Sequence, residues 1–133
     1  MKKILTLLAA LLGVALLAGC GSSSGSSAVQ TVDPQTWLAT ASQPGVVVVD
    51  VRTPGEYAAG HIKDAVNIDV EASTFDSNIA TLDKNATYVV YCHSGRRSSL
   101  ATDAMAKAGF THVYNLSGGF SDLAAAGGTV VTS

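Results

Sequence analysis

Cys92 is the residue in this sequence best placed to act as a nucleophile. It follows an apolar run at residues 88–91 and precedes a polar segment, residues 93–98, that reads His-Ser-Gly-Arg-Arg-Ser. Such a segment can wrap around the sulfur so that several backbone N–H groups point at it, because Gly95 tolerates a positive φ. Converging N–H groups, a helix N-terminus and two guanidinium groups lower a thiol pKa below its free value of about 8.5. We therefore predict a reactive thiolate; the alternative is an inert, buried thiol.

This loop needs a strand before it and a helix after it, and the hydrophobic pattern predicts both. Short β-branched or aromatic runs typical of central parallel strands lie at residues 46–50 and 88–91, with shorter strands expected at 65–68 and 113–116. Helices are expected at residues 34–41, 53–59, around 75–82, 98–108 and 120–126. The alternation predicts a three-layer α/β domain with a mainly parallel central sheet of about five strands flanked by helices.

Two separated motifs resemble those of the single-domain rhodanese, or thiosulfate sulfurtransferase, family. The first reads DVRTPGEY at residues 50–57, with GHI at 60–62 and AVNI at 65–68, and the second reads CHSGRRS at 92–98. The pair Gly118-Gly119 before Phe120 is a weaker landmark, and the resemblance spans about residues 30–131. A tryptophan that often follows the glycine pair in this family is replaced here by apolar residues such as Leu123, which we interpret as altered packing.

The resemblance implies a rhodanese-like fold and a two-step sulfur relay. Cys92 would attack the sulfane sulfur of a small anionic donor such as thiosulfate, forming a persulfide. The outer sulfur would then pass to a thiol, to cyanide or to a thioredoxin-like protein. No metal or organic cofactor is needed. The implied catalytic residue is Cys92, and the implied substrate-binding residues are His93, Ser94, Gly95, Arg96, Arg97, Ser98 and Arg52.

The three arginines of this set are expected to have different tasks. By the resemblance, Arg97 braces the loop and Arg96 faces the anionic donor. Arg52 stands four residues before Glu56 at a helix start, so an ion-pair network that includes Asp50 is the first interpretation, and contact with substrate is the second.

The histidines offer less chemistry than the arginines. His61 lies at a strand entry, where a hydrogen-bonding core residue is favoured over a general acid or base. His93 lies either at the mouth of the site or simply on the surface, and His112 is expected at the surface. Three scattered histidines without a second free cysteine do not form the closely spaced ligand pairs of a zinc site.

Three other functions compete with the sulfur relay. Cysteine-dependent phosphatases and arsenate reductases of a related type place cysteine and arginine at Cys-x5-Arg, whereas here the sixth residue after Cys92 is Ser98 and the loop is one residue too short. A sulfur-carrier or partner-binding module without thiosulfate turnover is the second alternative. A thiol–disulfide oxidoreductase is disfavoured, because the expected acylation of Cys20 would leave Cys92 without a resolving partner.

The N-terminal residues are typical of an export signal with a lipid attachment site. Lys2 and Lys3 precede an apolar stretch at residues 4–17, and the string Leu-Ala-Gly-Cys that ends at Cys20 resembles the lipobox of bacterial lipoproteins. The resemblance implies a signal peptide at residues 1–19, a lipidated Cys20 with a flexible Gly/Ser tether at 20–28, and a folded domain at 29–133. The expected location is the extracytoplasmic side of the bacterial cell membrane; an ordinary signal peptide is the alternative.

Length and charge exclude several classes of function. The 133 residues suffice for one small domain and not for a multidomain enzyme or a polytopic transporter. The formal net charge is −2 and charged residues make up 14% of the chain, so no basic surface is available to neutralise nucleic-acid phosphates.

Overall fold

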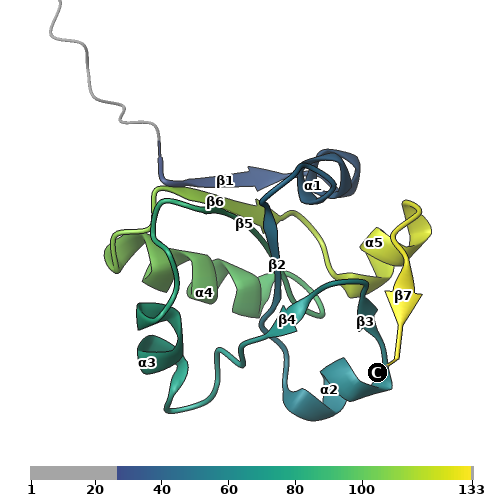
Figure 1. The fold of residues 1–133 in the computed structure, drawn as a ribbon. Helices are drawn as coiled ribbons and strands as arrows, with labels where there is room; N and C mark the ends of the chain where they lie inside the picture. The colour runs from purple at the N-terminus through teal and green to yellow at the C-terminus, as the bar shows by residue number, and fades with distance from the viewer. Residues whose placement is uncertain (1–26, 133) are drawn as a thin grey trace, which may run out of the picture.

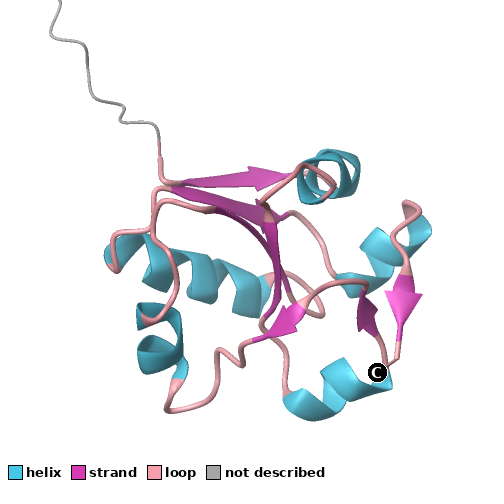
Figure 2. Ribbon diagram, in the orientation of Figure 1, coloured by secondary structure: helices cyan, strands magenta, loops and turns pink. Residues whose placement is uncertain are grey.

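The computed structural model describes residues 27–132, in which helices and strands alternate along the chain (Figure 2). The strands are β1 (Val29–Val32), β2 (Val47–Asp50), β3 (His61–Ile62), β4 (Val66–Asn67), β5 (Thr87–Tyr91), β6 (His112–Leu116) and β7 (Val130–Val131). The helices are α1 (Pro34–Ala41), α2 (Pro54–Ala59), α3 (Phe75–Ala80), α4 (Arg96–Lys107) and α5 (Phe120–Ala125).

Five strands form one parallel sheet in the order β1-β6-β5-β2-β4. Every neighbouring pair in it is parallel, with registers such as Val49 opposite Val90 and Tyr88 opposite Val113. The predicted α/β fold with a parallel sheet of five strands is therefore confirmed. Two elements were not expected from the sequence: the edge strand β1, and a separate antiparallel pair made by β3 and β7.

Helices cover both faces of the sheet, with α3 and α4 on one side and α1 and α5 on the other (Figure 1). Successive residues of β5 point to opposite faces, so Tyr88 and Val90 pack in one core and Val89 and Tyr91 in the other. The first core also contains Phe75, Ile79, Ala101 and Met105, and the second contains Trp37, Leu116 and Leu123. The three layers hold the strand before the cysteine rigidly between two apolar cores.

Helix α4 begins earlier than the sequence pattern predicts. We expected its start at Ser98, but the helix begins at Arg96, directly after Gly95, whose φ is +104°. Both arginines therefore belong to the first turn of α4 and not to the loop. Helix α1 has the predicted bounds, and its N-cap Asp33 accepts a hydrogen bond from the Thr36 backbone N–H at 2.7 Å.

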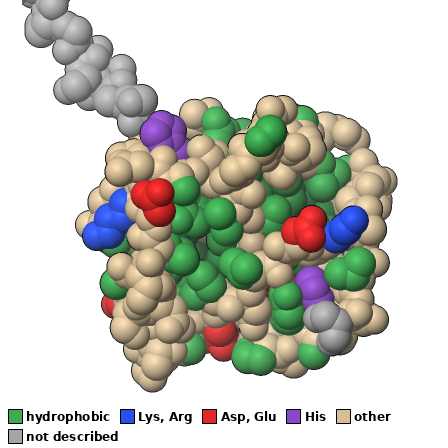
Figure 3. Space-filling view, in the orientation of Figure 1, with side chains coloured by type: hydrophobic (Ala, Val, Ile, Leu, Met, Phe, Trp, Pro, Cys, Tyr) green, Lys and Arg blue, Asp and Glu red, His purple; other side chains and the backbone are tan. Residues whose placement is uncertain are grey.

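The predicted signal peptide, the lipidated Cys20 and most of the tether lie outside the described residues. In the portion from residue 27 to residue 132, none of the helices has the length and apolar character needed to cross a bilayer. Apolar side chains gather over the middle of the face drawn in Figure 3.

Trp37 anchors α1 to the sheet and supplies a first prediction. Its side chain is 0% exposed, its Nε1–H donates to the Val90 carbonyl oxygen at 3.1 Å, and its ring meets that of Tyr91 edge-on. Replacing Trp37 with alanine should lower the free energy of unfolding by about 3–5 kcal/mol in urea titrations, through the cavity and the lost hydrogen bond. Gln35→Ala on the exposed side of the same helix should change it by about 0.5 kcal/mol or less. If both substitutions lowered the free energy of unfolding equally, the role of Trp37 as the anchor of α1 would be contradicted.

Candidate active site

Cys92 lies directly after β5, at the carboxyl edge of the sheet, where helix N-termini also gather. Its exposed fraction is 0%, and its Sγ accepts a hydrogen bond from the Gly95 backbone N–H at 3.0 Å. The segment after the cysteine turns around the sulfur as predicted, and the left-handed Gly95 closes that turn into α4. The sulfur is thus enclosed by backbone donors.

The surroundings of Cys92 lower its pKa below the ordinary value of a thiol. Burial acts in the opposite direction and raises the pKa, because a thiolate loses its water. The Ser98 side chain and the backbone N–H groups of Ser98, Gly95 and Ser94 lower the pKa by more than burial raises it. The net direction favours the thiolate, which is the nucleophilic form.

Gly119 allows α5 to lie directly against the cysteine loop. A Cβ at this position would stand 1.8 Å from the His93 carbonyl oxygen, so no other residue fits without moving the backbone. The next N–H, that of Phe120, donates to the carbonyl oxygens of Cys92 (2.9 Å) and His93 (3.2 Å). The glycine pair noticed in the sequence therefore joins the start of α5 to the loop.

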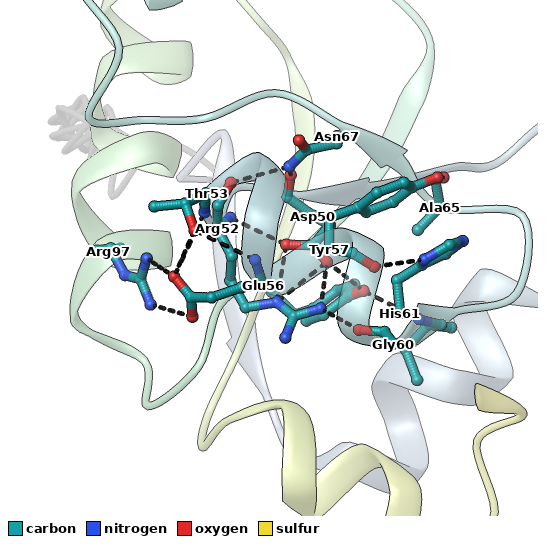
Figure 4. Close-up of polar contacts among 12 residues, drawn as sticks. Asp50, Arg52, Thr53, Glu56, Tyr57, Gly60, His61, Ala65, Asn67 and Arg97 are labelled. Atoms are coloured by element: carbon teal, nitrogen blue, oxygen red, sulfur yellow. Dashed lines mark hydrogen bonds and ion pairs between the residues drawn. The ribbon is translucent and has the colours of Figure 1, made fainter. Parts of the chain in front are cut away.

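Arg97 connects the loop to α2. Its Nη1 and Nη2 donate to Glu56 Oε1 (2.7 Å) and Oε2 (2.9 Å), a bidentate pair seen in Figure 4. Glu56 also forms a capping box with Thr53 at the start of α2. The expected pairing of Glu56 with Arg52 is wrong, because the two sequence motifs meet through Glu56 and Arg97.

Arg52 is buried, with 3% of its surface exposed, and is engaged by other partners. Its Nη2 lies 2.7 Å from Asp50 Oδ2 and donates to the Gly60 carbonyl oxygen at 2.7 Å, as Figure 4 shows. Its guanidinium carbon stands 4.2 Å from the centre of the Phe120 ring. The guanidinium therefore braces the scaffold, the first of the two roles considered from the sequence, while contact of Arg52 with a substrate stays a prediction.

Two polar residues of this scaffold were not singled out by the sequence analysis. The Tyr91 hydroxyl donates to Asp50 Oδ2 at 2.7 Å and accepts from the Ile62 N–H at 3.0 Å. Asn67 Nδ2 donates to the carbonyl oxygens of Asp50 (3.0 Å) and Arg52 (2.8 Å). Two signals in the sequence could have indicated them, because buried polar groups need hydrogen-bond partners. One is a tyrosine at the end of a buried strand, and the other is an asparagine within an apolar run.

The histidines are placed as follows. His61 is buried, its Nδ1 lies 2.8 Å from the Tyr57 carbonyl oxygen, and its ring stacks on that of Tyr57, so the expected core role is confirmed. His93 and His112 are exposed. Among residues 27–132, no three histidine, cysteine or acidic side chains come together in a group that could hold a metal ion.

A hollow of about 430 Å³ lies beside the cysteine loop. It is lined by Ser94 and Arg96, by Arg97, and by two residues that the sequence did not indicate, Glu71 and Leu100. A larger hollow of about 540 Å³, lined by residues such as Leu38, Val46 and Asp64, includes no residue of the loop. Of these two hollows, the smaller one therefore lies next to the loop that carries the nucleophile.

Comparison with known proteins identifies the family. The model of the rhodanese-like domain matches residues 34–126. The chain is 40% identical over 76 residues to the thiosulfate sulfurtransferase PspE of Escherichia coli K12, covering 57% of this chain and 72% of that protein. It is 38% identical over 94 residues to the thiosulfate sulfurtransferase GlpE of Pseudomonas entomophila, covering 71% and 84%.

Solved structures agree with this assignment. A rhodanese with anions from E. coli is 34% identical, with a TM-score of 0.55 over 66% of this chain and 99% of that one. The crystal structure of the Alr3790 protein from Anabaena superposes with a TM-score of 0.69 at 27% identity, over 77% and 82% of the two chains. The fold and the cysteine loop thus define a rhodanese-like domain, and the protein belongs to the rhodanese-like family, as the two motifs had indicated.

The close approach at Gly119 generates a prediction for Cys92. Gly119→Ala should displace the loop and weaken the donation of N–H groups to the sulfur. The midpoint of the pH titration of alkylation by iodoacetamide should then rise by about one pH unit. Gly55→Ala is the matched control, because a Cβ there meets open space. An unchanged midpoint in a folded Gly119→Ala protein would show that the loop does not depend on this contact.

The Glu56–Arg97 pair predicts a pH dependence of stability. Arg97 lowers the pKa of Glu56 from its ordinary 4.5 to about 2. A carboxylate whose pKa is lower in the folded state stabilises the protein above its unfolded pKa, and this contribution is lost as the pH falls through its folded pKa. The difference in unfolding free energy between the wild type and Glu56→Gln, measured in urea, should therefore narrow as the pH falls from 4.5 to about 2.

The control for this prediction removes the partner. In an Arg97→Gln background, adding Glu56→Gln should change the unfolding free energy by less, and this change should depend less on pH, because the guanidinium that lowers the carboxyl pKa is absent. If Glu56→Gln has the same pH-dependent effect on the unfolding free energy in both backgrounds, the Glu56–Arg97 pair is not its cause.

Proposed function

We propose that this protein is a sulfurtransferase that carries sulfane sulfur as a persulfide on Cys92, with thiosulfate as a donor. The observation that carries the proposal is the 3.0 Å hydrogen bond from the Gly95 N–H to Sγ, within a loop whose donors lower the thiol pKa. The donors of such a site stabilise a negative charge on the sulfur of Cys92. The relatives named thiosulfate sulfurtransferases support the choice of donor.

In the first step, the Cys92 thiolate attacks the outer sulfur of thiosulfate. A bond forms between Sγ and that sulfur, the sulfur–sulfur bond of the donor breaks, and its electron pair leaves with sulfite. One negative charge then resides on the outer sulfur of the persulfide. The N–H groups that held the thiolate lie beside this charge, and they are fixed by α4 and need no reorganisation as it develops.

In the second step, an acceptor thiolate or cyanide attacks the outer sulfur. The bond between that sulfur and Sγ breaks, and Cys92 leaves as a thiolate, which its low pKa makes a good leaving group. The acceptor departs as a persulfide or as thiocyanate. Covalent storage on one residue thus lets donor and acceptor react in turn.

The arginines of α4 divide their roles in this proposal. Arg97 is held by Glu56 and braces the loop. Arg96 is exposed at the rim of the small hollow and faces the anionic donor. A phosphatase reaction is disfavoured, because the spacing from Cys92 to Arg97 is one residue short of that motif and its guanidinium is already occupied.

The N-terminal sequence supports a location for this chemistry. We propose that residues 1–19 are removed as a signal peptide and that Cys20 is lipidated, so that the Gly/Ser-rich residues tether the domain to the extracytoplasmic side of a bacterial membrane. The test is the mass of the protein extracted from membranes, with Cys20→Ser as the control. A chain that keeps residues 1–19 or carries no acyl groups would contradict this part of the proposal.

The relay predicts a sulfur atom on one residue. Incubating the purified full chain with thiosulfate should add the mass of one sulfur, which peptide mapping should place on Cys92 and which cyanide should remove. Cys92→Ser should abolish the gain, while Cys20→Ser should leave it intact. If the mass stays unchanged with thiosulfate but rises with an organic persulfide, the protein is a carrier module without thiosulfate turnover. Unchanged mass together with hydrolysis of an aryl phosphate would favour a phosphatase.

A further inference from the structure

The hollow beside the cysteine loop has a charge pattern that a simple dianion does not match. Its charged residues are Arg96, Arg97 and Glu71, and its apolar residue is Leu100. What the hollow selects depends on which of these charges are already neutralised by neighbours.

Around Arg97, one of the residues that line the hollow, negative charge is in excess. Arg97 is paired with Glu56 by two short contacts of 2.7 and 2.9 Å. Glu71 Oε1 also stands 3.5 Å from Arg97 Nη1, and the Glu71 side chain is 60% exposed. Two carboxylates therefore share one guanidinium, and Glu71, the more distant and more exposed of them, is left to interact with a cation.

Arg96, another lining residue, supplies a positive charge. Arg96 is exposed, and within residues 27–132 no carboxylate lies in ion-pair distance of it. Leu100, one helical turn further along α4, leaves 56% of its surface exposed. The hollow thus combines one free guanidinium, one under-neutralised carboxylate and a small apolar surface.

We infer that this hollow selects zwitterionic sulfur compounds of the amino-acid type, with free cysteine as the simplest acceptor. Arg96 binds the α-carboxylate and Glu71 binds the α-ammonium group, while Leu100 contacts the methylene. Glu71 also repels doubly charged thiosulfate and so lowers the efficiency of that donor. The inference rests on the proposed function and names the acceptor class for the same site.

The transfer itself follows the second step described above. The thiolate of cysteine attacks the outer sulfur of the Cys92 persulfide, the bond between the two sulfurs of the persulfide breaks, and Cys92 leaves as a thiolate. The product is cysteine persulfide, and no oxidant or reductant is consumed. Glu71 and Arg96 take no part in bond making; they act as specificity-determining residues through charge.

Three acceptors test the two charges separately. The full chain is loaded with thiosulfate and discharged with cysteine, with 3-mercaptopropionate, which lacks the ammonium group, or with cysteamine, which lacks the carboxylate. For each thiol, the variant rate is divided by the wild-type rate, so the intrinsic reactivities of the thiols cancel. Asp103→Asn, an exposed acid on α4 outside the hollow, is the matched control.

Each substitution should affect a different pair of acceptors. Glu71→Gln should lower the rates of discharge by cysteine and by cysteamine about two- to fivefold, which is the effect of losing an exposed charge pair. The rate with 3-mercaptopropionate should stay unchanged. Arg96→Gln should lower the rates of discharge by cysteine and by 3-mercaptopropionate and leave the rate with cysteamine unchanged. Glu71→Lys should shift the preference between cysteamine and 3-mercaptopropionate by about tenfold, and added salt should reduce all of these effects.

A second readout needs no sulfur transfer. Cys92 is alkylated with anionic iodoacetate or with cationic bromoethylamine, each compared with neutral iodoacetamide, in the same variants. Glu71→Lys should raise the iodoacetate rate and lower the bromoethylamine rate, and Arg96→Gln should lower the iodoacetate rate.

The two readouts separate the two ideas. If no persulfide forms but the alkylation preferences shift as expected, the proposed function fails and the charge selectivity of the hollow stands. If the persulfide forms but the three thiols respond alike in every variant, the zwitterion assignment is overturned and the sulfur relay stands. Alkylation preferences equal to those of Asp103→Asn would also overturn it.

Discussion

The constraint on which this structure depends is that a buried thiol must be able to carry a negative charge. Removing an ion from water costs several kcal/mol even after the protein relaxes, so Cys92 needs donors that are already in place. A strand end, a left-handed glycine and the first turn of α4 supply them. The direction of the cysteine pKa shows that these donors outweigh the burial. Much of the surrounding architecture serves to keep that loop from moving.

Two further layers of polar contacts fix the loop from behind. Glu56 and Arg97 join α2 to α4, and the buried Asp50–Arg52 pair joins the end of β2 to the Gly60 carbonyl oxygen. A buried ion pair contributes little stability over an apolar replacement, but it tolerates few alternative arrangements because an unpaired charge is costly. The contacts therefore specify geometry more than they add stability, and geometry is what a preorganised site requires.

The sequence predicted well the parts of the fold that rest on local patterns. Three elements appear where propensity and capping place them: the β-branched β2, the aromatic-flanked β5, and α1 with its Asp33 N-cap and Pro34 at the first helical position. The cysteine loop was also predictable, because its glycine and its position after a buried strand are local signals. The two-residue strands β3 and β7 are too short to show any periodicity, so no local pattern indicated them.

Contacts between distant segments could not be predicted in the same way. Arg97 pairs with Glu56 across the site, whereas helical spacing alone pointed to Arg52 as the partner of Glu56. The position of Glu71 beside the loop depends on how the segment after β4 crosses the surface, which no motif encodes. The fine charge pattern of the site is therefore a tertiary property.

The pairing of β1 with β6 has a consequence for how the chain reaches this state. Val29, near the start of the described residues, lies opposite Val113, so the sheet is complete only when nearly all of the domain has been synthesised. β7 adds a second late contact, because Val131 pairs with His61, which follows the Gly60 whose carbonyl oxygen accepts a hydrogen bond from Arg52. Because long-range pairs such as these cost chain entropy before their contacts form, the edge of the sheet at β1 and the β3–β7 pair are completed late in folding.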